Sequence, residues 1–406
     1  MSNKLKEQNS AENKGRGLLI SLSLAHFLMD YMCHFYMFRF VKGAFTSDRV
    51  VALFILYNFL AFALQCPIGY LCDKVGVRLS VAVSLAMLGV GYLFAYLAFT
   101  RYTTGAAGAL LVIIGVLIIG LANSALHAGG VNGVMKPGKK GLIQGGVFIS
   151  FGALGVGLGD FYGSKAFDWI TIALFIVSMI AMVALFTAQF VSALSKRRAE
   201  KKDVDNVPGG LSIKGDSSKA VVVLVLCLVA VLARSYGGFL LPSGFTGLND
   251  AFNGSIMYDI RKAMLPSDLG FIGKLLGGFL VLLSVRLFKA KTDLRVASLR
   301  YGVAALIISG ILLVFFGEYT VPCALGIILF HSVMPVTLYE VYCLLPKNPG
   351  FSLGLTTLML FIGTLPTYVY NPSGSEKQLV LGITIAIAAA GLGICAGINS
   401  KEVKES

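Results

Sequence analysis

Long apolar runs separated by short polar segments repeat along almost the whole chain of 406 residues. Twelve of these runs reach the roughly 20 residues that a helix needs to cross a bilayer. Membrane-spanning strands would instead be shorter and would alternate apolar and polar residues. The pattern predicts an all-α membrane protein with transmembrane helices at residues 18–40, 50–71, 79–99, 106–127, 141–163, 168–193, 220–242, 264–287, 296–316, 320–343, 351–370 and 379–398.

Residues 195–219 differ from the other internal segments because they are charged and rich in Gly, Pro and Ser. This composition is typical of a linker. It divides the chain into an N-terminal tail (1–17), a six-helix half (18–194), the linker, a second six-helix half (220–398) and a C-terminal tail (399–406).

Short matches recur between the halves at an offset of 208 to 209 residues, as expected of a duplicated unit. The pairs are 24–26 with 232–234, 62–71 with 271–280, 77–79 with 285–287, and 141–145 with 350–354. Four matches in order at one offset predict that the two halves share one helix arrangement.

Basic residues are distributed unevenly about the predicted helices. If the N-terminus is cytoplasmic, inner segments hold 24 of the 34 Lys and Arg residues and outer loops hold 8, which is the bias expected of cytoplasmic loops. We therefore expect a multi-pass protein of the cytoplasmic membrane with both termini inside. The bias also explains the net charge of +14 without nucleic acid, because the bases are spread over loops. The seven cysteines show no CxxC spacing, so neither a disulfide framework nor a zinc site is expected.

The segment GYLCDKVGVRL between the second and third predicted helices contains the G-x-L-x-D-x-x-G-x-R pattern at Gly69, Leu71, Asp73, Gly76 and Arg78. This pattern resembles the signature of the major facilitator superfamily of transporters. The resemblance covers the whole chain and implies two six-helix halves that alternate access to a central cavity. It also implies a gating motif, in which Asp73 caps a helix of the opposite half and joins a charge network that holds the outward-facing state.

The second copy of this motif, residues 278–287, keeps the glycine and VRL but has Leu282 in place of the acid. We therefore expect only the first copy to act as a latch. A narrower resemblance links residues 23–30 and 123–155 to exporters of the fosmidomycin-resistance type. This chain departs from that group by having Ala128 and Gly129 after His127, where the group carries His-Pro-Glu, so one carboxylate is missing.

Ionised side chains inside predicted helices are costly and are therefore candidates for function. His26, Asp30 and His34 are spaced i, i+4, i+8 and share one face of the first helix. Such a column could take up and release protons, which makes the three residues candidates for proton coupling. The alternative is structural: the histidines bond neighbouring helices, and Asp30 pairs permanently with Arg234.

Six further residues are candidates for binding a substrate. Arg234 matches His26 by the repeat offset, and its guanidinium suits an anionic group, although an ion pair with Asp30 or Glu340 is an equal alternative. Lys274 matches Gln65, and its alternative is a lysine that reaches the membrane interface. The full set is Arg234, Lys274, His127, His331, Gln65 and Glu340.

These features predict a secondary active transporter that moves a small organic solute, with an anionic group favoured by Arg234. We expect a monomer in the lipid bilayer, driven by a proton gradient, without cofactor or bound metal. Export is slightly favoured by the narrower resemblance. The alternatives are a facilitator or importer without proton coupling, a sensor, or a divalent-metal carrier that uses His26, Asp30, Cys33 and His34. No enzyme motif occurs in the chain.

Overall fold

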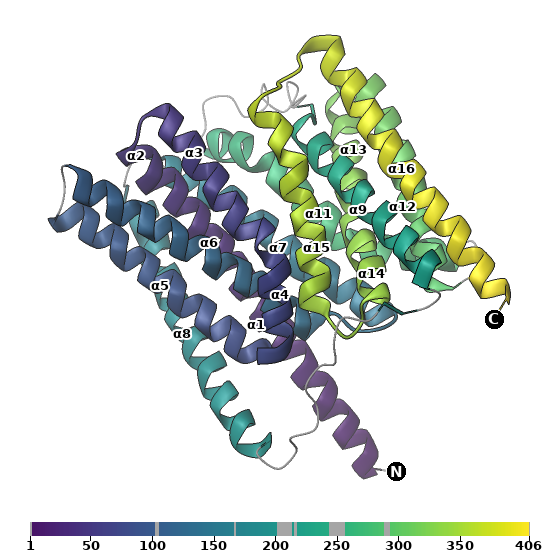
Figure 1. Cartoon of the computed structure of the whole chain (residues 1–406), viewed down its shortest axis with the longest axis horizontal. Helices are drawn as coiled ribbons and strands as arrows, with labels where there is room; N and C mark the ends of the chain where they lie inside the picture. The colour runs from purple at the N-terminus through teal and green to yellow at the C-terminus, as the bar shows by residue number, and fades with distance from the viewer. Residues whose placement is uncertain are drawn as a thin grey trace.

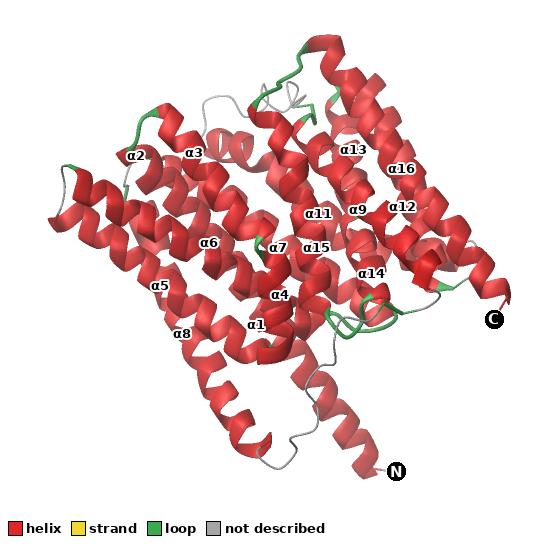
Figure 2. Cartoon of the chain, viewed as in Figure 1, coloured by secondary structure: helices red, strands yellow, loops and turns green. Residues whose placement is uncertain are grey.

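The computed structural model of the chain describes residues 2–101, 105–165, 168–200, 213–214, 217–242, 256–287 and 293–405. Within these residues the chain forms helices and connecting turns and no strand (Figure 2). Most of the predicted linker, residues 201–212 and 215–216, lies outside the described residues, so the boundaries of the linker and of the two halves stay a prediction.

The first half contains α1 (Ser2–Tyr36), η1 (Met37–Val41), α2 (Lys42–Ala44), α3 (Ser47–Asn58), η2 (Phe59–Ala63), α4 (Gln65–Val75), α5 (Val77–Arg101), α6 (Ala106–Val134), α7 (Lys139–Ser164) and α8 (Trp169–Glu200). The second half contains α9 (Ser217–Phe239), α11 (Ile256–Leu287), α12 (Leu294–Phe315), α13 (Thr320–Ser332), α14 (Met334–Leu344), α15 (Pro349–Thr364), η3 (Leu365–Tyr368) and α16 (Gly374–Glu405).

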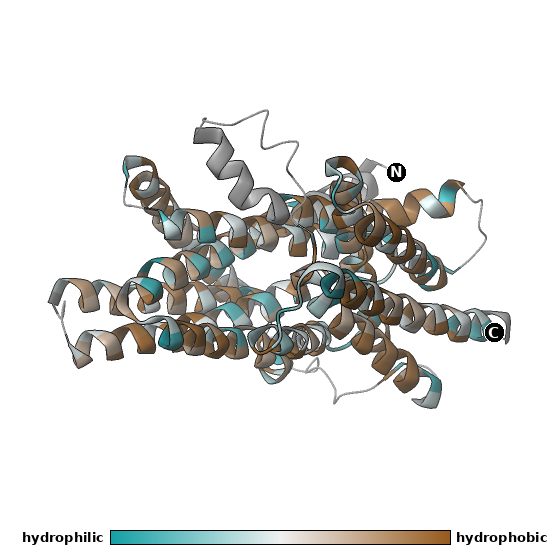
Figure 3. Cartoon of the chain, turned by 90° about the horizontal axis from the view of Figure 1, so that it is seen from above, coloured by the Kyte–Doolittle hydropathy of each residue, from teal (hydrophilic) through white to brown (hydrophobic). Residues whose placement is uncertain are grey.

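Among the described residues, eleven helical spans are long and apolar enough to cross a membrane, and the pair Ser47–Ala63 and Gln65–Val75, bent by 40°, makes a twelfth. The predicted all-α fold with twelve spans is therefore confirmed. The apolar exterior fits a lipid environment, since α8 exposes large side chains such as Trp169 (77%) and Ile180 (64%). Brown, hydrophobic ribbon accordingly covers much of the helices in Figure 3.

The two halves repeat one arrangement of helices, which Figure 1 shows as a purple-to-blue group beside a green-to-yellow group. α1 packs on α7 as α9 packs on α15, and α5 packs on α6 as α12 packs on α13. Across the interface α4 meets α15, and its repeat partner α11 meets α7. The sequence repeat at an offset of about 209 residues therefore corresponds to a structural repeat.

Both chain ends lie at the same end of the bundle, which we call the termini side; the opposite end is the distal side (Figure 1). An even number of spans requires this arrangement. The distribution of basic residues predicts that the termini side is cytoplasmic.

Candidate functional site

The middle of α1 is held close to the backbone of α7 by glycines. A Cβ atom at Gly152 would meet the His26 ring and the Asp30 carboxylate, and one at Gly155 would meet the Phe27 carbonyl oxygen. Only glycine lets the two helices approach this closely. As a result His26 and Asp30 are only 3% and 7% exposed, although both are polar.

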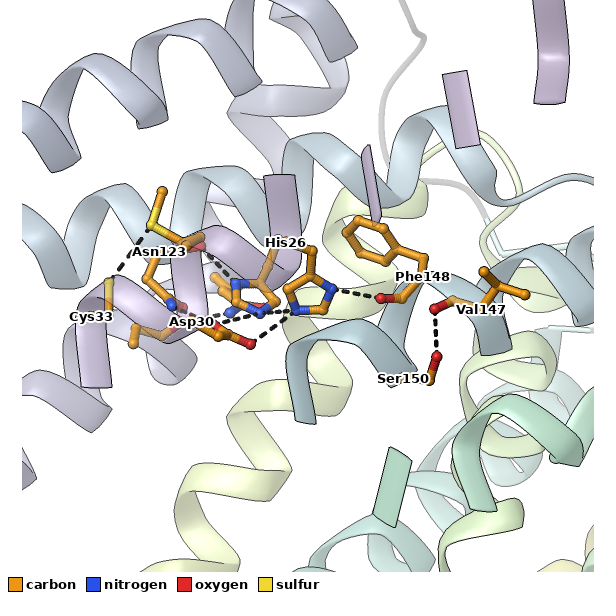
Figure 4. A network of polar contacts seen from close by, with 11 residues as sticks. His26, Asp30, Cys33, Asn123, Val147, Phe148 and Ser150 are labelled. Carbon is orange, nitrogen blue, oxygen red and sulfur yellow. Dashed lines mark hydrogen bonds and ion pairs between the residues drawn. The ribbon is translucent and has the colours of Figure 1, made fainter. Parts of the chain in front are cut away.

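His26 and Asp30 form a compact cluster with two residues of α6, Asn123 and His127 (Figure 4). The Nε2 atoms of His26 and His127 are 2.5 Å apart. The Asp30 carboxylate lies 3.2 Å from His26 Nε2 and 3.4 Å from His127 Nε2, and it accepts a hydrogen bond of 2.8 Å from Asn123 Nδ2. A cluster of this kind, buried within the helical bundle, needs its charges balanced locally.

The hydrogen bonds of the two Nδ1 atoms determine where the protons of this cluster are. His26 Nδ1 lies 2.7 Å from the Phe148 carbonyl oxygen, and His127 Nδ1 lies 2.8 Å from the Asn123 carbonyl oxygen. A carbonyl oxygen only accepts, so each Nδ1 carries a hydrogen, and a neutral imidazole then has none on Nε2. The close approach of the two Nε2 atoms suits one additional proton between the rings, and the neighbouring Asp30 carboxylate would balance its positive charge. We call His26, Asp30 and His127 the proton site.

The same three side chains place one donor atom each within 4.8 Å of one another, a spacing that could also hold a metal ion. Two nitrogens bound tetrahedrally to one zinc ion at about 2.0–2.1 Å would lie about 3.3 Å apart. The observed separation of 2.5 Å is shorter than that spacing and lies within hydrogen-bond distance. Binding a metal ion here would therefore require the two rings to move apart.

The predicted column on α1 separates into two groups. His34 does not join the proton site; its Nδ1 lies 2.7 Å from Asp160 Oδ1 on α7. The Cys33 thiol faces Met29 Sδ at 3.6 Å and donates to the Ile119 carbonyl oxygen at 3.7 Å. Cys33 and His34 thus bond to other partners in this structure, so the ligand set suggested for a metal carrier is not assembled here, and that alternative stays a prediction.

Two cations and a histidine of the second half lack polar partners within the described part of the chain. Arg234 on α9 is 5% exposed, its Nε atom is buried without a hydrogen bond, and its guanidinium lies 5.8 Å from the centre of the Phe330 ring. His331, where α13 meets α14, likewise has a buried Nδ1 atom without a partner. Lys274 on α11 interacts electrostatically with Arg234, with His331 and, across the interface, with Asp30. We call Arg234, Lys274 and His331 the cation site.

The structural ion pairs suggested for Arg234 are not formed. Glu340 is fully buried and binds Arg295 of α12 through both carboxylate oxygens, at 2.5 and 3.2 Å, and also accepts from Asn399 at 2.9 Å. Asp30 is occupied by the two histidines and Asn123. The alternative in which Arg234 pairs with either acid is therefore wrong, and the carboxylate of Glu340 is already satisfied within its own half.

Gln65, the repeat partner of Lys274, lies in the interface between α4 and α15. Its Nε2 atom donates to the Ala61 carbonyl oxygen of η2, and a Cβ added at Gly354 would meet its backbone oxygen. Its role in binding a substrate stays a prediction.

Asp73 of the sequence motif caps a helix of the opposite half, as predicted. Its Oδ1 accepts from the Gly350 N–H at 2.8 Å and its Oδ2 from the Phe351 N–H at 3.0 Å, both in the first turn of α15. These are the N–H groups that a helix leaves unpaired, and the carboxylate also faces the positive end of the helix dipole. Gly69 permits this approach, because a Cβ there would meet the Gly350 backbone.

The other three motif residues have more local surroundings. Gly76 ends α4 with φ = 91°, a conformation that favours glycine. Leu71 is 58% exposed, and Arg78 is half-buried at the start of α5. The partners of Asp73 that hold α15 are backbone N–H groups rather than the predicted charge network. The gating role of the motif stays a prediction.

The second copy of the motif makes the equivalent approach without an acid. A Cβ at Gly278 of α11 would lie 3.0 Å from the Leu142 carbonyl oxygen in the first turn of α7. Leu282 cannot cap that helix; instead the Gly138 N–H before α7 donates to the Tyr339 hydroxyl of α14 at 3.1 Å. The two interfaces on the termini side are thus similar in packing and different in polarity.

These features, two repeated six-helix halves joined by α4–α15 and α7–α11 contacts, define the major facilitator fold. No protein-family profile matches the chain, and no curated protein sequence matches it. Solved structures do. FucP, described as a Major Facilitator Superfamily transporter in the outward conformation, is similar over 93% of this chain and 98% of its own, with 12% identity and a TM-score of 0.59.

Two other solved structures have the same arrangement. A second structure of FucP, described as the E. coli fucose:proton symporter and carrying one substitution, matches at 13% identity and a TM-score of 0.56, over 93% of this chain and 98% of its own. A bacterial homologue of the iron transporter ferroportin, in an outward-facing state, matches at 13% identity and a TM-score of 0.56, over 94% and 98%. At this identity the likeness shows the fold. The narrower resemblance to fosmidomycin-resistance exporters stays a prediction.

Sequence reasoning missed several partners that the structure brings together. It treated His127 as a substrate residue, whereas His127 shares the proton site with His26. Asn123 and His127 are spaced i, i+4 on α6, and this spacing was a signal that both face one neighbour. Asp160 and Arg295 lie near the ends of predicted helices, where a charge needs no special explanation, so nothing in the sequence singled them out.

Proposed function

We propose that the protein is a secondary active transporter that moves a small organic anion together with a proton by alternating access. The fold supports this proposal, since one structural neighbour is described as a fucose:proton symporter. The observation that carries it is the pair of unlike sites in the two halves. The proton site joins two histidines through their Nε2 atoms beside a carboxylate, and the cation site opposite has no counter-ion of its own among the described residues.

Electrostatics couples the two sites. When the proton site is occupied, the imidazolium neutralises Asp30, so that Lys274 and Arg234 have no nearby negative charge and attract an anion. When the proton leaves, the negative charge of Asp30 acts on Lys274 across the interface, and it competes with the anion. Proton and anion therefore bind cooperatively and cross together.

Cooperative binding has a consequence for direction. A carrier that moves a proton and an anion in the same step is a symporter, and an inward proton gradient drives uptake. The electrostatics of the two sites thus favours import over the export suggested by the narrower resemblance. Opposite movement of proton and probe would reverse this assignment.

Transport in proteoliposomes tests the proposal with three labelled probes: lactate, succinate and glycerol 3-phosphate. We expect at least one probe to accumulate when the distal side is made acidic. Asp30→Asn should abolish that accumulation and retain counterflow at equal pH, because the substrate site persists. Arg234→Gln should lose both activities. Asp48→Asn, which removes an exposed acid of α3, is the matched control and should behave as wild type.

Nuclear magnetic resonance tests the proton site without any substrate. The chain has only four histidines, so selective ¹⁵N labelling gives few signals. We expect His26 and His127 to carry hydrogen on Nδ1 and to show scalar coupling through the hydrogen bond between their Nε2 atoms. His34→Gln should remove one set of signals and leave that coupling unchanged. A bare Nδ1 on either histidine would contradict the assignment.

The second candidate is a divalent-cation carrier, favoured by the grouping of three donor atoms and by the fold of the ferroportin homologue. Two features oppose it: the short separation of the Nε2 atoms, and the positive charges of Lys274 and Arg234 nearby. Calorimetric titration with zinc, iron(II) and manganese separates the two candidates. Stoichiometric binding that His127→Gln abolishes would replace the proton proposal.

A further inference from the structure

The cation site buries an arginine that no acid among the described residues neutralises. Arg234 is 5% exposed, and its Nε atom is buried without a hydrogen bond. A guanidinium removed from water needs a favourable contact to offset the lost hydration. In the described part of the chain that contact is the ring of Phe330 on α13, whose centre lies 5.8 Å from the guanidinium carbon of Arg234.

Two glycines bring α9 against the Phe330 ring. Gly237 and Gly238 follow Arg234 by three and four residues, so all three share one face of α9. Cβ atoms added at the two glycines would lie 3.6 and 3.9 Å from atoms of the Phe330 ring. The face of α9 that carries Arg234 therefore rests on this ring, which is itself only 1% exposed.

His331, the next residue on α13, extends the same arrangement toward α11. The ring centres of Phe330 and His331 are 5.4 Å apart, and their planes are at 87°. A Cβ added at Gly270 of α11 would lie 3.6 Å from His331 Nε2, and one added at Gly273 would lie 2.8 Å from the His331 Cβ. Phe330 thus lies beside both the guanidinium and the imidazole whose Nδ1 has no partner among the described residues.

A ring and a carboxylate hold an arginine in different ways. In the same half, Arg295 binds both oxygens of the fully buried Glu340, which cancels the charge of that arginine and occupies its Nε and Nη2 donors. The face of an aromatic ring attracts a guanidinium through its quadrupole and carries no opposite net charge. Arg234 beside Phe330 therefore keeps its full positive charge available to an anion.

We propose that Phe330 is a positioning residue of the cation site, which holds the Arg234 guanidinium in its binding geometry through a cation–π contact and leaves its charge uncancelled. This inference rests on the proposed function, in which Arg234 binds the anion. The physical basis is preorganisation: ordering a long side chain at the moment of binding weakens affinity, and the ring orders Arg234 beforehand. Removing the ring should weaken anion binding without slowing the steps that follow.

Counterflow at equal pH measures this effect in proteoliposomes, with whichever of the three probes is transported. Phe330→Leu should raise the half-saturating probe concentration about tenfold, a size expected of a desolvated cation–π contact, and leave the maximal rate within about twofold of wild type. Phe175→Leu removes a ring that packs on Phe35 and Tyr92 in the first half. It is the matched control and should keep wild-type kinetics.

Fluorinated phenylalanines at position 330, introduced with an expanded genetic code, separate the charge distribution of the ring from its shape. Successive ring fluorines weaken the quadrupole in steps and change the ring size little. The half-saturating concentration should rise with each added fluorine. Equal values across the series would overturn the cation–π role even if Phe330→Leu weakens binding, because a ring that only fills space is insensitive to fluorine.

Nuclear magnetic resonance tests the contact without any probe. With ¹⁵N-labelled arginine, the side-chain signals that disappear in Arg234→Gln belong to Arg234. These signals should carry a ring-current shift in wild type that Phe330→Leu removes. Identical Arg234 shifts in the two proteins would overturn the inference. Wild-type protein that shows the ring-current shift but transports none of the probes would instead overturn the proposed function, with the contact itself upheld.

Discussion

Replacing Asp73 by Asn perturbs one contact between the halves and leaves the helices otherwise unchanged. The carboxylate accepts from two backbone N–H groups of α15, at 2.8 and 3.0 Å. A hydrogen bond to a charged group contributes about 1.5–3 kcal/mol. Asn keeps one acceptor oxygen and loses the charge and the second bond, so we expect a cost of about 2 kcal/mol to the state in which the termini side is closed.

This cost changes a population that can be measured. About 2 kcal/mol corresponds to roughly a 30-fold change in equilibrium constant, so a closed state favoured about 99 to 1 would fall to about 3 to 1. Spin labels at Lys140 and Lys401, exposed residues of opposite halves, should then show a second, longer distance in double electron–electron resonance. The seven native cysteines are first replaced, so that only the two introduced cysteines carry labels. Asp48→Asn in the same background is the control. An unchanged distance distribution in Asp73→Asn would refute the latch.

Other predictions concern packing and buried charge. Glu340→Gln leaves Arg295 without its buried partner, which should cost about 3 kcal/mol and lower the midpoint of thermal unfolding in detergent. The double variant Arg295→Met, Glu340→Leu should recover most of this stability. No recovery would show that the pair is needed for more than charge balance. Gly155→Ala should destabilise the protein, because the added Cβ would meet the Phe27 backbone. Gly397→Ala, whose added Cβ would meet nothing within 4 Å, should be neutral or slightly stabilising. Equal unfolding temperatures in the two variants would contradict the close packing of α1 on α7.

Much of the fold was predictable because membrane helices depend on few variables. Length and hydropathy define the spans, and the internal repeat predicts which helices occupy equivalent places. The capping role of Asp73 was also predictable, because the motif carries it. The particular helix that it caps was not, since the first turn of α15 becomes a neighbour of Asp73 only when the halves meet.

The site was less predictable because its members come from different helices. Spacing on α1 suggested that His26, Asp30 and His34 act together, but the partner of each side chain depends on how α6 and α7 pack on α1, and glycines of α7 such as Gly152 and Gly159 set that approach. His34 therefore pairs with Asp160 and His26 with His127. From sequence, Glu340 is a plausible cavity residue because its carboxylate has no partner within its own helix. Its actual partner is Arg295, which lies at the start of α12.

The central claim is that one proton, held by His26, Asp30 and His127, crosses with each anion. A reversal-potential measurement in proteoliposomes loaded with the transported probe gives the number of protons that move with it. The account predicts one proton per probe molecule in wild type and none in Asp30→Asn, with counterflow preserved in both. A ratio of one that persists in Asp30→Asn, or a wild-type flux that does not respond to pH, would contradict it.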